Sequence, residues 1–255
     1  MKALDILIFM VGLVVGSFLN VCIVRIPEGK NIFWGRSKCP HCGHVIPWYD
    51  NIPLLSFILL RGRCRYCKQK ISVLYPVVEL ITAIVTLALF KKYGLSYSFL
   101  YYVVFAYFLI VLGIIDLKTK LLLNRILLPM LIAGLMINVI GQIVPFKDAL
   151  IGAVLGGAAM WLIAVLGTKI FNKEALGMGD VKLAFVAGFF LGWKHILIAL
   201  YLGFIFAFVT IIVLWLIYRK DIPKLIPMGP FLAMGFIFYL FYGQKLIQWY
   251  LGLIS

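Results

Sequence analysis

The stretch FAYFLIVLGIID, residues 105–116, decides the fold, because it is a long apolar run that ends in a single carboxylate. Similar apolar runs, each near the ~20 residues that cross a bilayer core, recur along the whole chain. The 255 residues are 64% hydrophobic and 13% charged, whereas soluble domains are about 25% charged. We therefore expect an all-α polytopic membrane protein, since helices satisfy their own backbone hydrogen bonds inside lipid.

About eight membrane spans are predicted, with breaks at Lys, Arg, Pro or Gly. The sixth is short, so it is tilted, buried among neighbours, or paired with the seventh as a re-entrant segment. A total of seven or nine membrane crossings is therefore also possible. The first run continues without a convincing cleavage site and is expected to be a retained span. The eight predicted spans cover approximately residues 3–24, 73–90, 97–115, 126–144, 149–168, 182–193, 196–218 and 228–249.

The basic residues predict the orientation of these spans. With eight crossings, 18 of the 24 Lys and Arg residues fall on one face. The positive-inside rule makes that face cytoplasmic and places both termini outside. The net charge of +15 therefore reflects topology and contact with anionic lipid, and no nucleic-acid partner is expected. The six on the other face are Lys2, Lys91, Lys92, Lys147, Lys194 and Lys245.

One sizeable polar loop, about residues 25–72, carries two C-x2-C pairs separated by 21 residues. Each pair offers two thiolates at the spacing that tetrahedral Zn²⁺ requires. Two disulfides are the alternative, which a reducing cytoplasmic location disfavours. So small a loop buries little core, so the metal is expected to be structural. The four expected ligands, with His41 and His44 left as solvated loop residues, are Cys39, Cys42, Cys64 and Cys67.

Asp116 ends one apolar run, and Asp180 opens another after the sequence GMG, residues 177–179. The alternation of spans places both carboxylates at the cytoplasmic membrane boundary, where ionisation is costly and acids are usually functional. If the two meet, one holds a proton while the other stays ionised, which suits aspartic proteolysis. Gly177 and Gly179 would let an extended substrate backbone approach. The plainer reading is that Asp116 ends one helix and Asp180 N-caps the next.

Taken in order, these motifs resemble those of the bacterial prepilin peptidases, which are membrane enzymes of type IV pilus, type II secretion and competence systems. The resemblance covers nearly the whole chain, and the order and spacing of the motifs are specific. They are GSFLNVCIVRIP (16–27), the paired cysteine loop, WYDNIPLLSF (48–57), ISVLYPVVELIT (71–82), the aspartate before LKTKLLLN (117–124), GMGDVKLAFVAGFFLGW (177–193) and PMGPFLAMG (227–235).

The resemblance implies an activity and a site. Asp116 and Asp180 match the family's catalytic aspartates, and the four cysteines match its zinc ligands. The substrate would be a prepilin or pseudopilin with a basic leader ending in glycine, followed by an apolar helix. Cleavage would follow that glycine on the cytoplasmic side of the inner membrane, and S-adenosylmethionine would then supply a methyl group to the new N-terminus.

Three domains are expected on this basis: a first span at 1–24, the zinc loop at 25–72 associated with methyl transfer, and the peptidase bundle at 73–255. No glycine-rich nucleotide motif of the Rossmann type is present. Glu79 is the acid we expect to serve methyl transfer, although it could instead make a helix–helix hydrogen bond. Leu74 replaces an arginine common in the family, and Leu123 replaces a proline.

Two other function classes and one local alternative stay open. A transporter or scaffold could use the two aspartates as cation or proton sites, although they lie at a boundary and no inverted repeat is seen. A presenilin-type GxGD protease would share the chemistry but lacks the cysteine loop.

The segment IPMGPFL, residues 226–232, either starts the last helix or lines the substrate path beside the aspartates.

Overall fold

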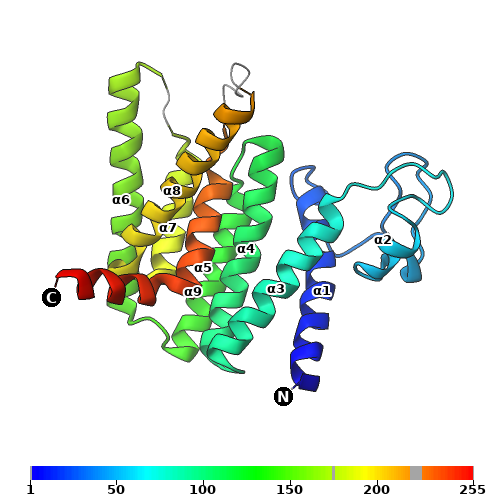
Figure 1. Ribbon diagram of the computed structural model, residues 1–255, viewed down its shortest axis with the longest axis horizontal. Coiled ribbons are helices and arrows are strands. Elements are labelled where there is room, and N and C mark those ends of the chain that lie inside the picture. Colours follow the sequence, from blue (N-terminus) through cyan, green and yellow to red (C-terminus); the bar gives the residue numbers. More distant parts are fainter. Residues whose placement is uncertain (1, 174–175, 219–225, 255) are drawn as a thin grey trace. The chain divides into compact units, whose positions relative to one another are not determined.

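A computed structural model of the chain describes residues 2–173, 176–218 and 226–254 (Figure 1). Within these ranges all regular elements are helical, which confirms the predicted all-α fold. The cations Arg219, Lys220 and Lys224, which belong to the expected cytoplasmic set, lie outside them. The chain divides into a first unit, Met1–Gly94, and a second unit, Leu95–Ser255.

The first unit holds two long helices and the polar loop between them. Close packing of α1 (Lys2–Arg25) on α3 (Leu74–Tyr93) depends on two glycines. A Cβ atom on Gly12 would lie 2.6 Å from the Cα of Ala83, and one on Gly16 would lie 2.6 Å from the Cα of Glu79. Such small residues are what helix pairs in lipid use to approach each other. The bundle expected from the sequence, residues 73–255, includes α3. In the structure α3 lies in the first unit.

The second unit is a bundle of six helices lying side by side, coloured green to red in Figure 1. Short connections reverse the chain direction, so the end of α4 and the start of α7 lie at the same end of the bundle. The helices are α4 (Tyr97–Thr119), α5 (Asn124–Gly141), α6 (Phe146–Phe171), α7 (Met178–Leu191), α8 (Trp193–Tyr218) and α9 (Gly229–Ile254).

Local polar contacts fix several of these helix ends. The Ser96 side chain accepts a hydrogen bond from the Phe99 N–H at 3.2 Å and so caps α4. Asn138, buried near the end of α5, donates to the Val144 carbonyl at 2.8 Å and accepts from the Val144 N–H at 2.9 Å. Because both amide atoms are paired, a polar side chain is tolerated there.

The sixth predicted span is α7, and it is short, as expected. Its 14 residues rise about 21 Å, less than the ~30 Å of a hydrocarbon core. The other seven long helices are apolar and long enough to cross a membrane. From Val181 onward most of α7 is buried, so this helix is surrounded by protein.

The polar loop of the first unit also forms two short helices, η1 (Trp48–Asn51) and α2 (Leu55–Leu59), which were not predicted.

Candidate active site and metal centre

Asp116 lies on the last turns of α4 and is 5% exposed. Its Oδ2 accepts a hydrogen bond from the backbone N–H of Gly229, the first residue of α9, at 2.9 Å. A Cβ atom on Gly229 would lie 2.7 Å from this oxygen. Only glycine therefore allows the start of α9 to reach the carboxylate. Since α4 continues to Thr119, Asp116 does not act as a helix terminator.

Asp180 lies in the first turn of α7 and is 8% exposed. Gly177 occupies the N-cap position, so the plainer reading of Asp180 as an N-cap is wrong. Its Oδ1 is buried and has no hydrogen-bond partner among the described residues. Asp180 lies at the end of the bundle where α4 ends, because a Cβ atom on the neighbouring Gly179 would meet Leu122, three residues after the end of α4. A buried carboxylate oxygen without a partner indicates a place for water or a ligand.

The two glycines beside Asp180 differ in their surroundings. A Cβ atom on Gly179 would lie 2.8 Å from the Cβ of Leu122, in the connection that follows α4. One on Gly177 would meet the Oδ2 of Asp180 at 3.4 Å. Gly179 thus lets the start of α7 pack against the connection from the other aspartate's helix. A role for either glycine in binding substrate stays a prediction.

The four loop cysteines form one cluster, with all Sγ atoms within 4.8 Å of one another. All four are free thiols, so the disulfide alternative is absent from the described loop. The Sγ atoms of Cys39 and Cys67 are 3.8 Å apart. Zn–S bonds of about 2.3 Å in a tetrahedron place sulfur atoms about 3.8 Å apart. The cluster therefore has the size and donor set that a metal ion such as zinc requires.

Each cysteine pair sits in a tight backbone turn. The Cys39 N–H donates to the His44 carbonyl at 2.9 Å, and the Cys64 N–H donates to the Gln69 carbonyl at 2.9 Å. Gly43 and Lys68 turn the chain with φ values of 69° and 57°. The Cys42 N–H lowers the pKa of Cys39 to about 6, which favours the thiolate form that binds metal.

The side chains around the cluster have structural partners. The Asp50 carboxylate accepts two hydrogen bonds from the Arg65 guanidinium, at 2.6 and 2.8 Å. This bond raises the pKa of Arg65. Asp50 thereby joins η1 to the second cysteine pair, as a turn residue beside the cysteines. His44 is exposed and its ring lies against that of Tyr66, with centroids 3.5 Å apart and planes tilted by 36°. It is outside the cluster, which consists of the four cysteines.

Glu79 is buried in α3 and borders a cavity of about 750 Å³ within the first unit. Its Oε2 accepts a hydrogen bond from the backbone N–H of Leu54 at 2.9 Å. Ser17 on the facing helix α1, Asn20 and Tyr75 also line the cavity. The observed hydrogen bond joins Glu79 to the loop, so the helix–helix hydrogen bond considered as an alternative stays a prediction. The carboxylate lies beside a cavity of ligand size.

Sequence reasoning missed two of the groups that shape these sites. Gly229 holds Asp116, and the only available signal was the Gly-Pro pair that starts the last helix. Arg25 was read only as a topological charge. Its guanidinium donates to the carbonyls of Asn31, Trp34 and Gly35 at 2.8–3.0 Å, which fixes the start of the loop.

The fold and its sites define a polytopic membrane protein with two buried aspartates at one end of a helix bundle and a four-cysteine cluster. Residues 103–216 match the model of the type IV leader peptidase family, and residues 10–93 match that of the bacterial peptidase A24 N-terminal domain. The chain belongs to the type IV leader peptidase family. No solved structure gives a significant match.

Several relatives named prepilin leader peptidase/N-methyltransferase resemble the chain over most of its length. The Aeromonas hydrophila protein is 36% identical, across 96% of this chain and 93% of its own. The Pectobacterium carotovorum protein is 38% identical, across 89% of both chains. The Myxococcus xanthus protein is 42% identical across 74% of this chain, and the match spans 57% of that relative's length.

Proposed function

We propose that the chain is a membrane aspartic endopeptidase that removes the leader of type IV prepilins or pseudopilins and N-methylates the new N-terminus. One observation carries the proposal. Asp116 and Asp180 come from different helices and are both buried at the same end of the bundle, where one carboxylate oxygen of Asp180 has no partner among the described residues. The relatives' printed names supply the substrate class.

The two aspartates divide the chemistry of cleavage. The ionised carboxylate accepts a proton from a water molecule while the water oxygen attacks the carbonyl carbon of the scissile peptide. The protonated carboxyl group donates its proton to the departing nitrogen, and the C–N bond breaks. The products are a new carboxylate on the leader and a free amine on the mature protein. The Gly229 N–H holds Asp116 in place by its hydrogen bond.

The substrate is anchored by its own apolar helix and diffuses in the plane of the membrane. Its leader is short and basic and ends in glycine, and cleavage follows that glycine. The backbone must be locally extended for water to reach the carbonyl carbon, and Gly177 and Gly179 leave room for it beside Asp180. The cleavage site lies at the cytoplasmic face of the bacterial inner membrane, with the charge distribution as the supporting argument.

Methyl transfer is assigned to the first unit. Its cavity, of about 750 Å³, lies within the range of small-molecule sites. Its lining holds both carboxylates, such as Glu79, and cations, such as Arg36, which suits a cofactor that carries charges of both signs. S-adenosylmethionine, when bound, supplies the methyl group to the new amine. Glu79 holds that amine and accepts the proton that the amine loses as the N–C bond forms. The hydrogen bond from the Leu54 N–H orients the carboxylate.

Zinc is assigned a structural role at Cys39, Cys42, Cys64 and Cys67. Between residues 26 and 73 of the first unit, only Cys39, Ser56 and Cys64 are buried. So small a core cannot order the loop, whereas a structural zinc ion contributes roughly 10–16 kcal/mol of apparent binding free energy. The four thiolates hold the ion, and the loop that they fix completes the wall of the cavity.

Mass spectrometry of a prepilin incubated with the protein in lipid vesicles tests the proposal. The wild-type protein should remove the leader and, with S-adenosylmethionine present, add one methyl group. Asp116→Asn and Asp180→Asn should each leave the substrate intact. Asp148→Asn is the control, because Asp148 is a carboxylate of the same unit that accepts a hydrogen bond from Trp193 instead. Near-normal cleavage by either test variant contradicts the proposal.

A further inference from the structure

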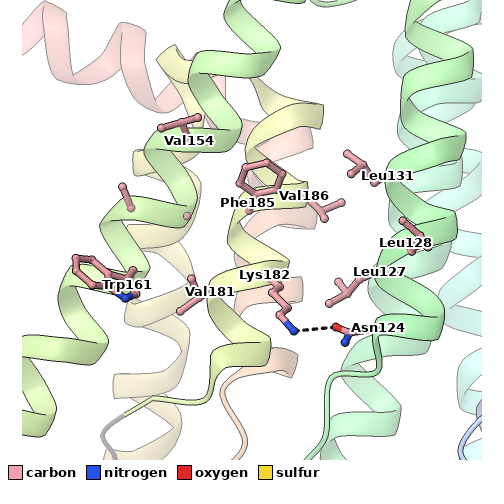
Figure 2. A pocket seen from close by; sticks show the side chains of 12 residues that line it. Asn124, Leu127, Leu128, Leu131, Val154, Trp161, Val181, Lys182, Phe185 and Val186 are labelled. Carbon is pink, nitrogen blue, oxygen red and sulfur yellow. Dashed lines mark hydrogen bonds between the residues drawn. The ribbon is translucent and has the colours of Figure 1, made fainter.

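A groove of about 720 Å³ opens on the second unit between α5 and α6, with α7 as its floor (Figure 2). Most of its lining is apolar. Leu128 on α5, Trp161 on α6 and Phe185 on α7 are 60%, 49% and 40% exposed. The small residues Gly157 and Ala158 on α6 leave the space open. Along α5 the lining runs from Asn124 to Leu131, about 10 Å or two helical turns.

The groove has one polar end. There the Lys182 ammonium donates a hydrogen bond to the Asn124 Oδ1 at 3.2 Å, while Leu131, Val154 and Val186 line the opposite end (Figure 2). Lys182 and Asn124 lie in the first turns of α7 and α5, the bundle end that also holds the aspartates. An occupant of the groove would thus meet polar groups at the aspartate end and apolar side chains further along.

The groove begins next to Asp180 in the sequence, because Val181 and Lys182 are part of its lining. The aspartate and the groove occupy neighbouring faces of the first turns of α7. A chain bound in the groove therefore needs only a short extended segment to reach the carboxylate oxygen without a partner. We infer that this groove binds the apolar helix of the substrate, on the side of the scissile bond that stays in the membrane.

Physical considerations favour a helix over lipid tails as the occupant. Exposed apolar side chains are ordinary on a membrane-facing surface, so exposure alone is no argument. Inside a bilayer, helices associate through close packing, since lipid is as apolar as leucine. A concave surface with small residues at its base gives an entering helix more packing contacts than a flat helix face. The Asn124 Oδ1 supplies an acceptor for N–H groups left unpaired where that helix begins, and the Lys182 ammonium supplies a donor for carbonyl groups of the extended segment before it.

Photo-cross-linking tests the inference, which rests on the proposed function. The photo-reactive residue p-benzoylphenylalanine replaces Leu128 in the groove or, as a control, Leu216, which is 62% exposed on α8 and outside the lining. Each protein is placed in vesicles with a membrane-inserted prepilin, in the Asp116→Asn background that retains uncleaved substrate. Position 128 should cross-link to the apolar helix of the prepilin at least about tenfold more than position 216.

A filling variant gives a second readout. Ala158→Phe places a ring in the groove, and Ile163→Phe places one on the same helix outside the lining. Ala158→Phe should raise the KM for the membrane-inserted prepilin about tenfold with kcat near normal, and Ile163→Phe should change neither. If cleavage is normal but position 128 cross-links only to lipid, or Ala158→Phe behaves as its control, the groove assignment is wrong and the proposed function stands. If the wild-type protein cleaves no prepilin, both fail.

Discussion

The polar loop of the first unit and the helix bundle of the second unit are held together in opposite ways. Between residues 26 and 73 the described loop buries three side chains, two of them metal-site cysteines. The bundle buries large side chains such as Phe105, Phe190 and Phe236. If the cysteines hold zinc as proposed, the loop depends on a metal ion, whereas the aspartate site depends on helix packing. We therefore expect that methylation and cleavage, the two proposed activities, can be lost separately.

Loss of the metal should have the largest effect on methylation. Chelation, or Cys39→Ser combined with Cys64→Ser, should disorder the loop and reduce methylation by at least about 100-fold, because the metal supplies most of the loop's folding free energy. Cleavage should stay within about threefold of normal. Mass spectrometry of the product reports both, and hydrogen exchange reports the loop. Parallel loss of both activities would break the comparison.

Replacement of Glu79 should separate the two activities at a single side chain. Glu79→Gln keeps the shape but removes the base, so methylation should slow by about 100-fold while cleavage is unchanged. The expected product is cleaved and unmethylated. Asp5→Asn, in the same unit and outside the cavity lining, is the control and should leave both rates unchanged. Normal methylation by Glu79→Gln would mean that this residue only binds the loop through its hydrogen bond with Leu54.

A substitution at Gly229 tests whether its contact positions Asp116. In Gly229→Ala the new methyl group would lie 2.7 Å from the Asp116 Oδ2, so the carboxylate must move. Cleavage should fall about 10- to 100-fold while methylation of an already cleaved substrate persists. Gly252→Ala is the control, since a Cβ atom there meets nothing within 4 Å. Unchanged cleavage with normal abundance would show that the Gly229 hydrogen bond does not position Asp116.

The Asp50–Arg65 pair should give the smallest effect. The Arg65 side chain is 48% exposed, although that of Asp50 is 6% exposed, and an ion pair whose cation is open to water contributes little to stability. Asp50→Asn should increase the rate of metal loss to a chelator by about two- to threefold and leave cleavage unchanged. The rate can be followed with a colorimetric zinc indicator. A rate as fast as that of a cysteine variant would mean that the pair, and not the thiolates, controls the loop.

Much of the fold could be predicted because lipid restricts the choices. Apolar length alone located the helices to within a few residues, and the short sixth span corresponds to α7, Met178–Leu191. The position of the aspartates at one end of the bundle followed from the alternation of spans. Four cysteines at a regular spacing likewise predicted one cluster, since few other arrangements suit that pattern.

Features that depend on close approach could not be read from the sequence. Gly16 against Glu79, Gly179 against Leu122 and Gly229 against Asp116 are each contacts between distant segments. A glycine shows only that space is needed, and not which atom needs it. The same holds for Arg25, whose partners are backbone carbonyls that carry no sequence signal. The groove beside α7 also depends on how three helices diverge.

A double-mutant cycle on cleavage tests the central claim, that Asp116 and Asp180 act as one unit, most directly. Cleavage rates of one prepilin are measured in vesicles for wild type, Asp116→Asn, Asp180→Asn and the double variant. Each single variant should cleave at least about 1,000-fold more slowly than wild type, and the double variant should be scarcely slower than either. The reason is that substitutions of residues that act together have non-additive effects. Modest single losses that multiply in the double variant would contradict the central claim.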